Sequence, residues 1–257
     1  MDKQTKEPEL QAEQSFISHL LELRTRLLRA IAAIALALLL LLPFAGEIYS
    51  WLAGPLLQHL PVNSSMIAID VVSPFMIPFK MAMMLAVFIT IPYLLYQLWA
   101  FIAPGLYRHE QRFALPLLVS STVLFYTGVA FAFFIVLPVL FRFLVGVAPE
   151  GIAVMTDIGR YLDFIIAMFF AFGFTFEIPV ATVLLVATGI TTPAALVAAR
   201  PYVIVGAFIV GMLLTPPDVI SQTMLAIPMW VLYEAGIIAS RAVLKRKPQS
   251  AAEERGS

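Results

Sequence analysis

Long stretches without a charged residue recur along this chain and limit what it can fold into. No residue is charged over residues 81–107 or 113–141, and further uncharged runs occupy residues 30–46, 164–176 and 201–217. About 20 apolar residues in a helix cross the hydrocarbon core of a bilayer. Backbone polar groups in that core must be satisfied internally, as they are in a helix. The sequence therefore predicts an integral membrane protein made of helices.

The composition supports this class and excludes others. The chain is 61% hydrophobic and 12% charged, with a mean hydropathy of +0.94, whereas soluble domains are about half apolar and about a quarter charged. A membrane β-barrel is disfavoured because the apolar runs are continuous and do not alternate. The chain has no cysteine, which excludes disulfides, iron–sulfur clusters and thiolate zinc sites. The formal net charge is zero, so total charge indicates no class of partner.

Six apolar segments are predicted to be transmembrane helices. They cover approximately residues 30–44, 74–103, 113–144, 161–188, 202–215 and 219–240. The fifth has only about 14 residues and reaches ~21 Å, less than the hydrocarbon thickness of about 30 Å. We therefore expect an all-α, polytopic protein with short fifth and sixth helices. Residues 1–257 would form one six-helix transmembrane domain, with polar tails over residues 1–14 and 242–257.

The segment before the first span has an amphipathic pattern. Phe16, Leu20, Leu23 and Leu27 recur every three or four residues between polar positions. This pattern predicts a helix at the membrane surface that leads into the first span. A cleaved signal peptide is the alternative, but the charged stretch is too long for the start of such a peptide and further spans follow.

The basic residues predict the orientation. With six spans, both termini lie on one side of the membrane, and most lysines and arginines fall on that side. Only Lys80, Arg142 and Arg160 fall on the other side. The positive-inside rule therefore predicts that both termini and the loop that carries Glu110 are cytoplasmic.

That loop follows the second span and concentrates charge. Pro104 and Gly105 end the preceding helix, since proline cannot continue the hydrogen-bond ladder and glycine tolerates the turn. Arg108, Glu110 and Arg112 follow within a few residues. The loop is predicted to offer a carboxylate and several cations at the membrane surface, next to the ring of Phe101.

One carboxylate is predicted inside the membrane. Glu177 lies near the middle of the fourth span, where a charge costs several kcal/mol and indicates a function by default. Pro179 has no N–H to donate to the carbonyl of Thr175, so this carbonyl is a second unpaired polar group close to Glu177. The alternative is a protonated glutamate that a neighbouring helix satisfies.

The other acidic candidates have simpler explanations. Glu22 is at helical spacing from Arg26, and Glu110 is close to Arg112, so spacing alone favours local surface pairs of little energetic weight. Asp218 follows two prolines at a turn on the far side of the membrane. Asp218 could simply be a turn residue that caps the next helix, and this explanation is as good as a role in function.

The sequence predicts no enzyme and no cofactor. Motifs for metal-dependent hydrolysis, serine hydrolysis and phosphate binding are missing. The three histidines are far apart in sequence and no thiol accompanies them, which disfavours a metal site. A proton-coupled small-solute transporter with Glu177 as carrier remains an alternative, although the two halves show no repeat. An intramembrane protease would need a nucleophile and base that the sequence does not offer.

Several specific stretches occur along the chain, namely HLLELR (19–24), SPF (73–75), FIAPGLYRHE (101–110), PLLVSS (116–121), FEIP (176–179), RPY (200–202), MLLTPPD (212–218) and IP (227–228). Together these stretches resemble a known family, the TatC family of signal-peptide receptors in the twin-arginine protein translocase. The similarity covers roughly residues 15–241.

The resemblance implies an architecture and a set of partners. It implies six transmembrane helices in a cupped arrangement in the cytoplasmic membrane, with both termini inside. The implied function is to bind twin-arginine signal peptides and, with single-span subunits of the TatA and TatB type, to export folded proteins with the proton gradient. The implied partners include membrane lipids and further copies in homo- and hetero-oligomers, but no nucleic acid.

The resemblance also implies roles for single residues. Glu22, Arg24, Phe101 and Glu110 are similar to the surface that receives the signal arginines, and Glu177 to a buried acid on the concave face. Far-side positions important for transport match Pro55, Phe75 and Asp218. Phe133 stands where many relatives have tyrosine, so a role that needs the hydroxyl is not expected here.

Overall fold

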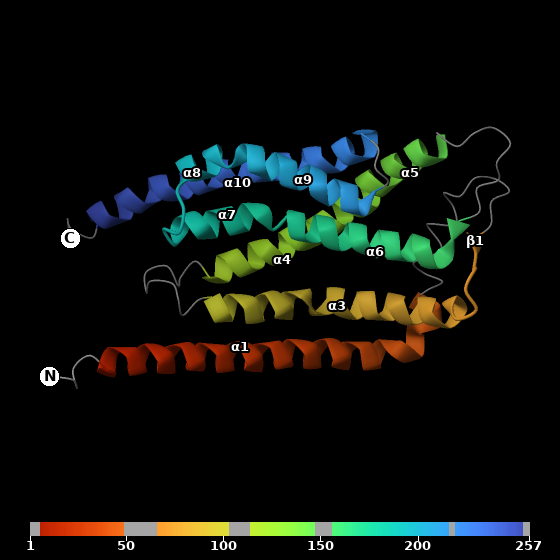
Figure 1. Cartoon of the computed structure of the whole chain (residues 1–257), viewed down its shortest axis with the longest axis horizontal. Coiled ribbons are helices and arrows are strands. Elements are labelled where there is room, and N and C mark those ends of the chain that lie inside the picture. The colour runs from red at the N-terminus through yellow and green to blue at the C-terminus, as the bar shows by residue number, and fades with distance from the viewer. Residues whose placement is uncertain (1–5, 49–65, 103–113, 147–155, 216–218, 254–257) are drawn as a thin grey trace. The chain divides into compact units, whose positions relative to one another are not determined.

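The computed structural model describes residues 6–48, 66–102, 114–146, 156–215 and 219–253, and it is helical almost throughout these ranges (Figure 1). In these ranges the only strands have two residues each. The predicted all-α class is confirmed. The elements are α1 (Lys6–Leu41), η1 (Leu42–Phe44), β1 (Met66–Ile67), α3 (Ser73–Ile102), α4 (Ala114–Phe131), η4 (Ala132–Val136), α5 (Leu137–Gly146), β2 (Thr156–Asp157), α6 (Ile158–Thr175), α7 (Ile178–Ala187), α8 (Pro193–Ala198), α9 (Arg200–Leu214) and α10 (Val219–Glu253).

Six apolar helical segments match the six predicted spans. Five are long and apolar enough to cross a membrane, namely Ser18–Ile48, Ser73–Phe101, Leu115–Phe143, Ile158–Ala187 and Gln222–Ala242. The remaining segment is α9, which corresponds to the fifth predicted span. Its 15 residues extend only about 22 Å, which confirms the prediction that the fifth helix is short. The last apolar segment has 21 residues, enough to cross the hydrocarbon core, and its helix α10 has 35 residues. The expectation of a short sixth helix is therefore wrong, because the helix continues through the polar residues that follow the apolar segment.

The N-terminal region differs from the prediction. The amphipathic stretch is not a separate helix, because α1 runs through it and through the first span as one helix of 36 residues. Its length of about 54 Å exceeds what the hydrocarbon core requires. Helix also replaces the loose tail from Lys6 onward. Glutamate, glutamine, alanine and leucine favour helix here, and no glycine or proline separates the amphipathic stretch from the span.

The third and fourth spans contain an interruption. The third passes from α4 through the π-helical segment η4 into α5. The fourth ends its first part, α6, at Thr175 and resumes as α7 at Ile178, with Phe176 and Glu177 in a turn. Pro179 lies in the first turn of α7, where a missing N–H costs no helical hydrogen bond. The fourth span therefore carries its carboxylate at a break in the helix.

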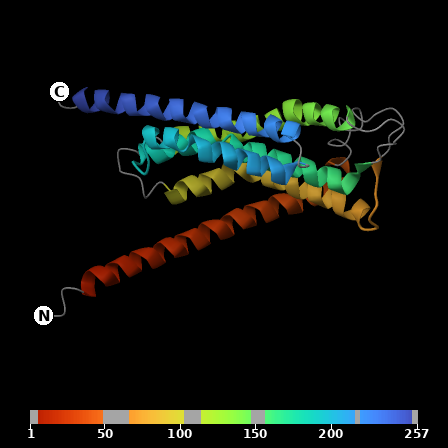
Figure 2. The same cartoon turned by 45° about the horizontal axis from the view of Figure 1, so that its top comes forward.

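The chain divides into two compact units, which are described separately. The first contains Met1–Leu52 and Pro78–Ala114, and so holds α1 and most of α3. The second contains Ala53–Ile77 and Leu115–Ser257. Within the second unit, α10 packs along α7 and α9, and these helices lie side by side in both views (Figure 1 and Figure 2).

Small side chains allow close helix packing in the second unit. A methyl group at Gly236 of α10 would collide with the Thr182 hydroxyl of α7 and lie 3.0 Å from Cα of Pro179. Small residues permit such approaches between membrane helices. The hydroxyl of Tyr233 in α10 donates to the carbonyl of Leu196 in α8 over 2.7 Å. The three helices α7, α8 and α10 therefore share one core.

A short parallel sheet joins the segment before α3 to the segment before α6 in the second unit. Met66 pairs with Thr156 and Ile67 with Asp157. The Asp157 side chain caps α6, because its carboxylate accepts from the amide of Arg160 over 3.1 Å. It also accepts from the amide of Ile69 over 3.4 Å. These hydrogen bonds, with that of Arg160 the largest contribution, hold the pKa of Asp157 below its ordinary value.

We predict that Asp157→Ala lowers the melting temperature of the purified protein at pH 7, whereas Asp157→Asn, which can still cap, has a smaller effect. Because the folded pKa of Asp157 is lowered, its contribution to stability is complete above the unfolded pKa of about 4 and is lost as the pH falls through the folded pKa. The difference between wild type and Asp157→Ala should thus shrink towards pH 3. Thermal unfolding in detergent at both pH values measures it, and a difference independent of pH would contradict the cap.

Candidate functional site

Polar and aromatic side chains of α1 and α3 meet on one face within the first unit. His19 of α1 stacks on Phe101 of α3, with ring centroids 4.2 Å apart, and Arg26 of α1 contacts Gln97 of α3. Higher numbers on α1 meet lower numbers on α3, so the two helices run antiparallel at this face. We call this set the α1–α3 polar cluster, which consists of His19, Glu22, Arg26, Tyr93, Gln97 and Phe101.

The centre of this cluster is an ion pair within α1. Nη2 and Nε of Arg26 donate to Oε1 of Glu22 over 2.6 and 2.9 Å. The side chains are 20% exposed for Arg26 and 35% exposed for Glu22. The local pair predicted from the i, i+4 spacing is therefore confirmed. Both hydrogen bonds reach the same carboxylate oxygen, so Oε2 faces no partner in the described part of the chain.

The buried amide of Gln97 links this pair to α3. Its Oε1 accepts from Nη1 of Arg26 over 3.3 Å, and its Nε2 donates to the hydroxyl of Tyr93 over 2.6 Å. Gln97 is 6% exposed, so its amide orientation is fixed by a donor on one side and an acceptor on the other. The sequence analysis did not select Gln97, although a glutamine inside an apolar span was a signal for it.

The other residues predicted for this surface differ in their position. Phe101 is half-buried in the α1–α3 polar cluster. Arg24 is exposed, and because residues two apart on a helix do not share a face, it does not join the cluster. Glu110 lies outside the described residues, so its predicted place beside Glu22 stays a prediction.

A second candidate site lies at the break in the fourth span. The hydroxyl of Ser121 in α4 lies near the carboxyl group of Glu177, and Ser121 is 1% exposed. The Oε1 atom of Glu177 is buried and has no hydrogen-bond partner among the described residues. The buried Oε1 atom is therefore open to a donor from outside the described residues, and both the functional explanation and a protonated glutamate satisfied by a neighbouring helix stay predictions. Ser121 was not selected from the sequence.

Aromatic rings surround the break. Phe176, which precedes Glu177, lies 5.5 Å from Phe131 by ring centroids, and Phe131 lies 5.5 Å from Phe172. Phe133, at the position where a tyrosine was expected in relatives, belongs to the π-helical segment η4 and packs 6.2 Å from Phe169. Phenylalanine contacts therefore pack α4 and η4 against α6 and the turn that carries Glu177.

The far-side residues are only partly described. Phe75 lies in the first turn of α3 and is 74% exposed, which leaves its ring available to a partner. Pro55 and Asp218 lie outside the described residues. Their predicted roles stay predictions.

An ion pair that the sequence analysis missed fixes α9 against α10. Nε of Arg200 lies 2.6 Å from Oε1 of Glu234, and Nη2 donates to Oε2 over 2.6 Å. Nε is close to Oε1 but makes no hydrogen bond with a described residue, so the charge-assisted hydrogen bond between the two side chains is that of Nη2. Glu234 lies inside an apolar span, which was the signal for a partner.

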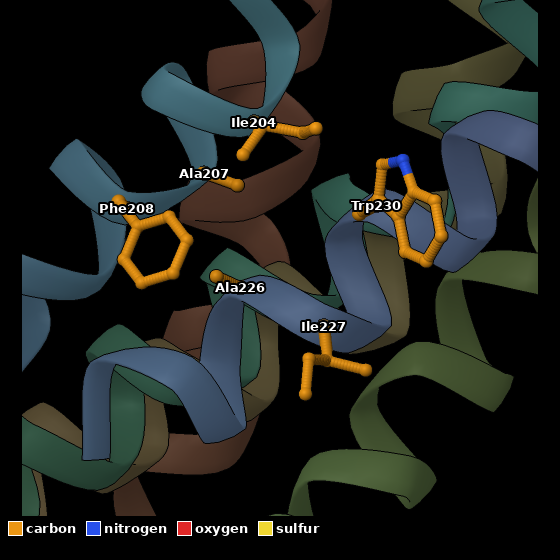
Figure 3. A pocket seen from close by; sticks show the side chains of 6 residues that line it. All are labelled: Ile204, Ala207, Phe208, Ala226, Ile227 and Trp230. Atoms are coloured by element: carbon orange, nitrogen blue, oxygen red, sulfur yellow. The ribbon is translucent and has the colours of Figure 1, made fainter. Parts of the chain in front are cut away.

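An apolar groove lies between these two helices. It has a volume of about 220 Å³, and Figure 3 shows its side chains projecting from α9 and α10. The lining residues are Ile204, Ala207, Phe208, Ala226, Ile227 and Trp230. Of these, Phe208 is 37% and Trp230 40% exposed. The groove offers apolar surface and almost no hydrogen-bonding group.

No group of three or more histidine, aspartate or glutamate side chains in the described ranges has the geometry of a metal site. What the structure holds instead is a polar cluster between two helices, a carboxylate at a helix break and an apolar groove. Together with the six apolar helical segments, these features define a polytopic helical membrane protein whose sites suit binding.

Comparison with known proteins identifies the family. The model of the family described as Sec-independent protein translocase protein (TatC) matches residues 18–228. The chain belongs to this family. It is 51% identical over 249 residues to the TatC protein of Azotobacter chroococcum mcd 1, which covers 97% of this chain and 98% of that protein. It is 56% identical over 228 residues to the TatC protein of Escherichia coli strain K12, which covers 89% and 88%.

A solved structure agrees with this assignment. The crystal structure described as the twin arginine translocase receptor TatC superposes with a TM-score of 0.78 at 36% identity, over 87% of this chain and 98% of that one. The predicted resemblance is confirmed, and the chain is a component of a protein translocase.

Proposed function

We propose that this chain is the receptor and core subunit of a twin-arginine translocase in the cytoplasmic membrane. It binds signal peptides with paired arginines and, with single-span subunits of the TatA and TatB type, exports folded proteins with the proton gradient. The observation that carries the proposal is the α1–α3 polar cluster. There Glu22 and Phe101, two residues selected for this role, lie on one face within the first unit.

The chemistry of the cluster suits an arginine ligand. Guanidinium groups form charge-assisted hydrogen bonds with carboxylates, about twice as strong as neutral ones. Oε2 of Glu22 offers one such acceptor, and Glu110, in the loop that follows α3, would offer another. An aromatic ring such as that of Phe101 adds a cation–π contact of about 0.5–2 kcal/mol. Arg24, exposed on another face of α1, would contact a different part of the peptide.

The second unit supports the role of partner helices. The groove between α9 and α10 presents exposed apolar rings, and Glu177 keeps an unpartnered oxygen. The apolar side chains of a single-span helix could pack in the groove, and one polar residue of such a helix could donate to the Glu177 oxygen. The short α9 would also thin the bilayer locally or be covered by such a helix. Pro55, Phe75 and Asp218 are assigned to far-side steps of transport.

We predict that removing either cytoplasmic carboxylate weakens signal-peptide binding. If Glu22 and Glu110 receive arginines in a partly desolvated groove, Glu22→Ala or Glu110→Ala should cost about 2–5 kcal/mol in binding, a loss of more than tenfold. Glu110→Asp should fall between wild type and Glu110→Ala. Photo-cross-linking of a twin-arginine peptide to the folded, membrane-inserted protein measures the effect.

A matched peptide with two lysines is the control, and it should cross-link weakly to the wild-type protein. If both carboxylates form surface pairs only, each change would cost at most about 1 kcal/mol and leave cross-linking intact. Cross-linking that survives the double variant Glu22→Ala and Glu110→Ala would refute the receptor site.

We predict that Glu177 acts through hydrogen bonding with a partner helix or the bound peptide. Glu177→Gln keeps the shape and an acceptor oxygen, so partner assembly should change little. Glu177→Leu removes the acceptor and should weaken assembly more. Co-purification of the chain with a tagged single-span subunit measures this. Equal damage from both changes would mean that the acid itself is required, which would favour a proton carrier.

We predict that both termini and the loop with Glu110 are cytoplasmic. Small tags at either terminus and at Tyr107 should be labelled only from the cytoplasmic side. Tags within residues 45–73 or 146–160 should be labelled only from outside, because basic residues favour the cytoplasmic side. Impermeant labelling of right-side-out and inverted vesicles measures this. A tag at Tyr107 that is labelled from outside would contradict the orientation.

A further inference from the structure

Arg26 places a cation of the protein itself on the carboxylate that is proposed to bind cations. Its Nε and Nη2 atoms both donate to Oε1 of Glu22, over 2.9 and 2.6 Å, and its Nη1 donates to Oε1 of Gln97. All three guanidinium nitrogens therefore have acceptors. A ligand at Glu22 would find one oxygen already taken by a guanidinium and the other, Oε2, without a partner in the described residues.

The position of Arg26 is set from the neighbouring helix. Gln97 is buried, and its amide nitrogen is held by the hydroxyl of Tyr93, so its oxygen points towards Arg26. Arg26 is itself only 20% exposed, whereas Glu22 is 35% exposed. The guanidinium is thus anchored to both helices, while the carboxylate keeps an open side. Arg26 would therefore stay in place when a second cation arrives.

A fixed cation beside the acceptor does not affect all ligands equally. A guanidinium spreads its charge over a plane, is weakly hydrated, and can lie parallel to a second guanidinium while it donates to the free oxygen. An ammonium group is a compact and strongly hydrated point charge, so the nearby cation repels it more and its desolvation costs more. A repulsive element of this kind is a general source of specificity.

We propose that Arg26 is a specificity-determining residue of the Glu22 site and selects arginine over lysine in the signal peptide. It leaves Glu22 a single free oxygen next to a fixed positive charge, a position that a planar guanidinium tolerates better than an ammonium group. Gln97 is the positioning residue that keeps Arg26 there. This inference rests on the proposed signal-peptide function of Glu22.

The test compares two signal peptides that differ only in having two arginines or two lysines. Their dissociation constants are measured with the full chain in membrane vesicles or detergent, for the wild type and for Arg26→Gln. We expect the preference for arginine to fall roughly fivefold in Arg26→Gln, which is about what one partly exposed charge pair can contribute. The fall should come mainly from tighter binding of the lysine peptide.

Two further variants separate selectivity from stability. Arg29→Gln removes an exposed positive charge from the same helix three residues further on, and it should leave the preference unchanged. Gln97→Leu keeps a similar volume but removes the anchor of Arg26, so it should lower the preference by a smaller factor. Gln97→Leu also serves if Arg26→Gln fails to insert.

The outcomes distinguish this inference from the function on which it rests. If Glu22→Ala does not weaken the arginine peptide, the proposed receptor site fails. If Glu22→Ala weakens it but Arg26→Gln and Gln97→Leu leave the preference unchanged, only the role of Arg26 fails. Equal weakening of both peptides in Arg26→Gln would also overturn the inference, because that is what a purely structural ion pair predicts.

Discussion

Polar groups that a hydrophobic chain carries into or beside the bilayer must find partners within the protein, and this constraint governs the sites described above. Where a partner exists, the polar group joins helices: Gln97 joins α3 to α1 through Arg26, and Glu234 joins α10 to α9 through Arg200. Where the partner is incomplete, as at Oε1 of Glu177, the unsatisfied atom costs free energy that a ligand or another subunit would recover. Polar side chains with partners therefore hold the helices together, and a polar side chain without a complete set of partners indicates a binding site.

The same constraint explains why the irregular backbone lies where it does. The fourth span breaks beside Glu177, and Pro179 begins the second half at a position where no helical hydrogen bond is lost. Unpaired backbone groups at such a break are tolerable only where side chains or neighbouring helices shield them from lipid. Here the amides of Phe176 and Glu177 stay paired, because they donate to the carbonyls of Phe172 and Phe174 over 2.9 and 3.0 Å. The break therefore leaves few backbone groups for neighbouring side chains to cover.

Much of the fold could be predicted from sequence because apolar runs and prolines act locally. The lengths of the apolar runs predicted the six segments and the short α9. The i, i+4 spacing along α1 predicted the pair of Glu22 with Arg26. The continuity of α1 was missed because its amphipathic start and its apolar end have different periodicities, although nothing in the sequence interrupts the helix. The partners of Gln97, Ser121 and Glu234 could not be predicted, since each lies on another helix and depends on packing that no local pattern encodes. The family resemblance selected Glu22 and Phe101, but it gave no reason why His19 and Arg26 should accompany them.

The two acidic sites differ in how easily they can exchange partners. The pair of Glu22 and Arg26 is partly exposed, so the net contribution of its hydrogen bonds is small, because water competes for both groups. In the proposed function, a second guanidinium would join such a carboxylate at little cost and would leave again after the cargo is delivered. The Oε1 atom of Glu177 is buried, and in such a place a hydrogen bond is stronger and an unpaired group costs more. A contact there would be slower to open. A receptor that must bind and release cargo gains from the first kind of site at the membrane surface, and a lasting contact between subunits gains from the second kind within the membrane.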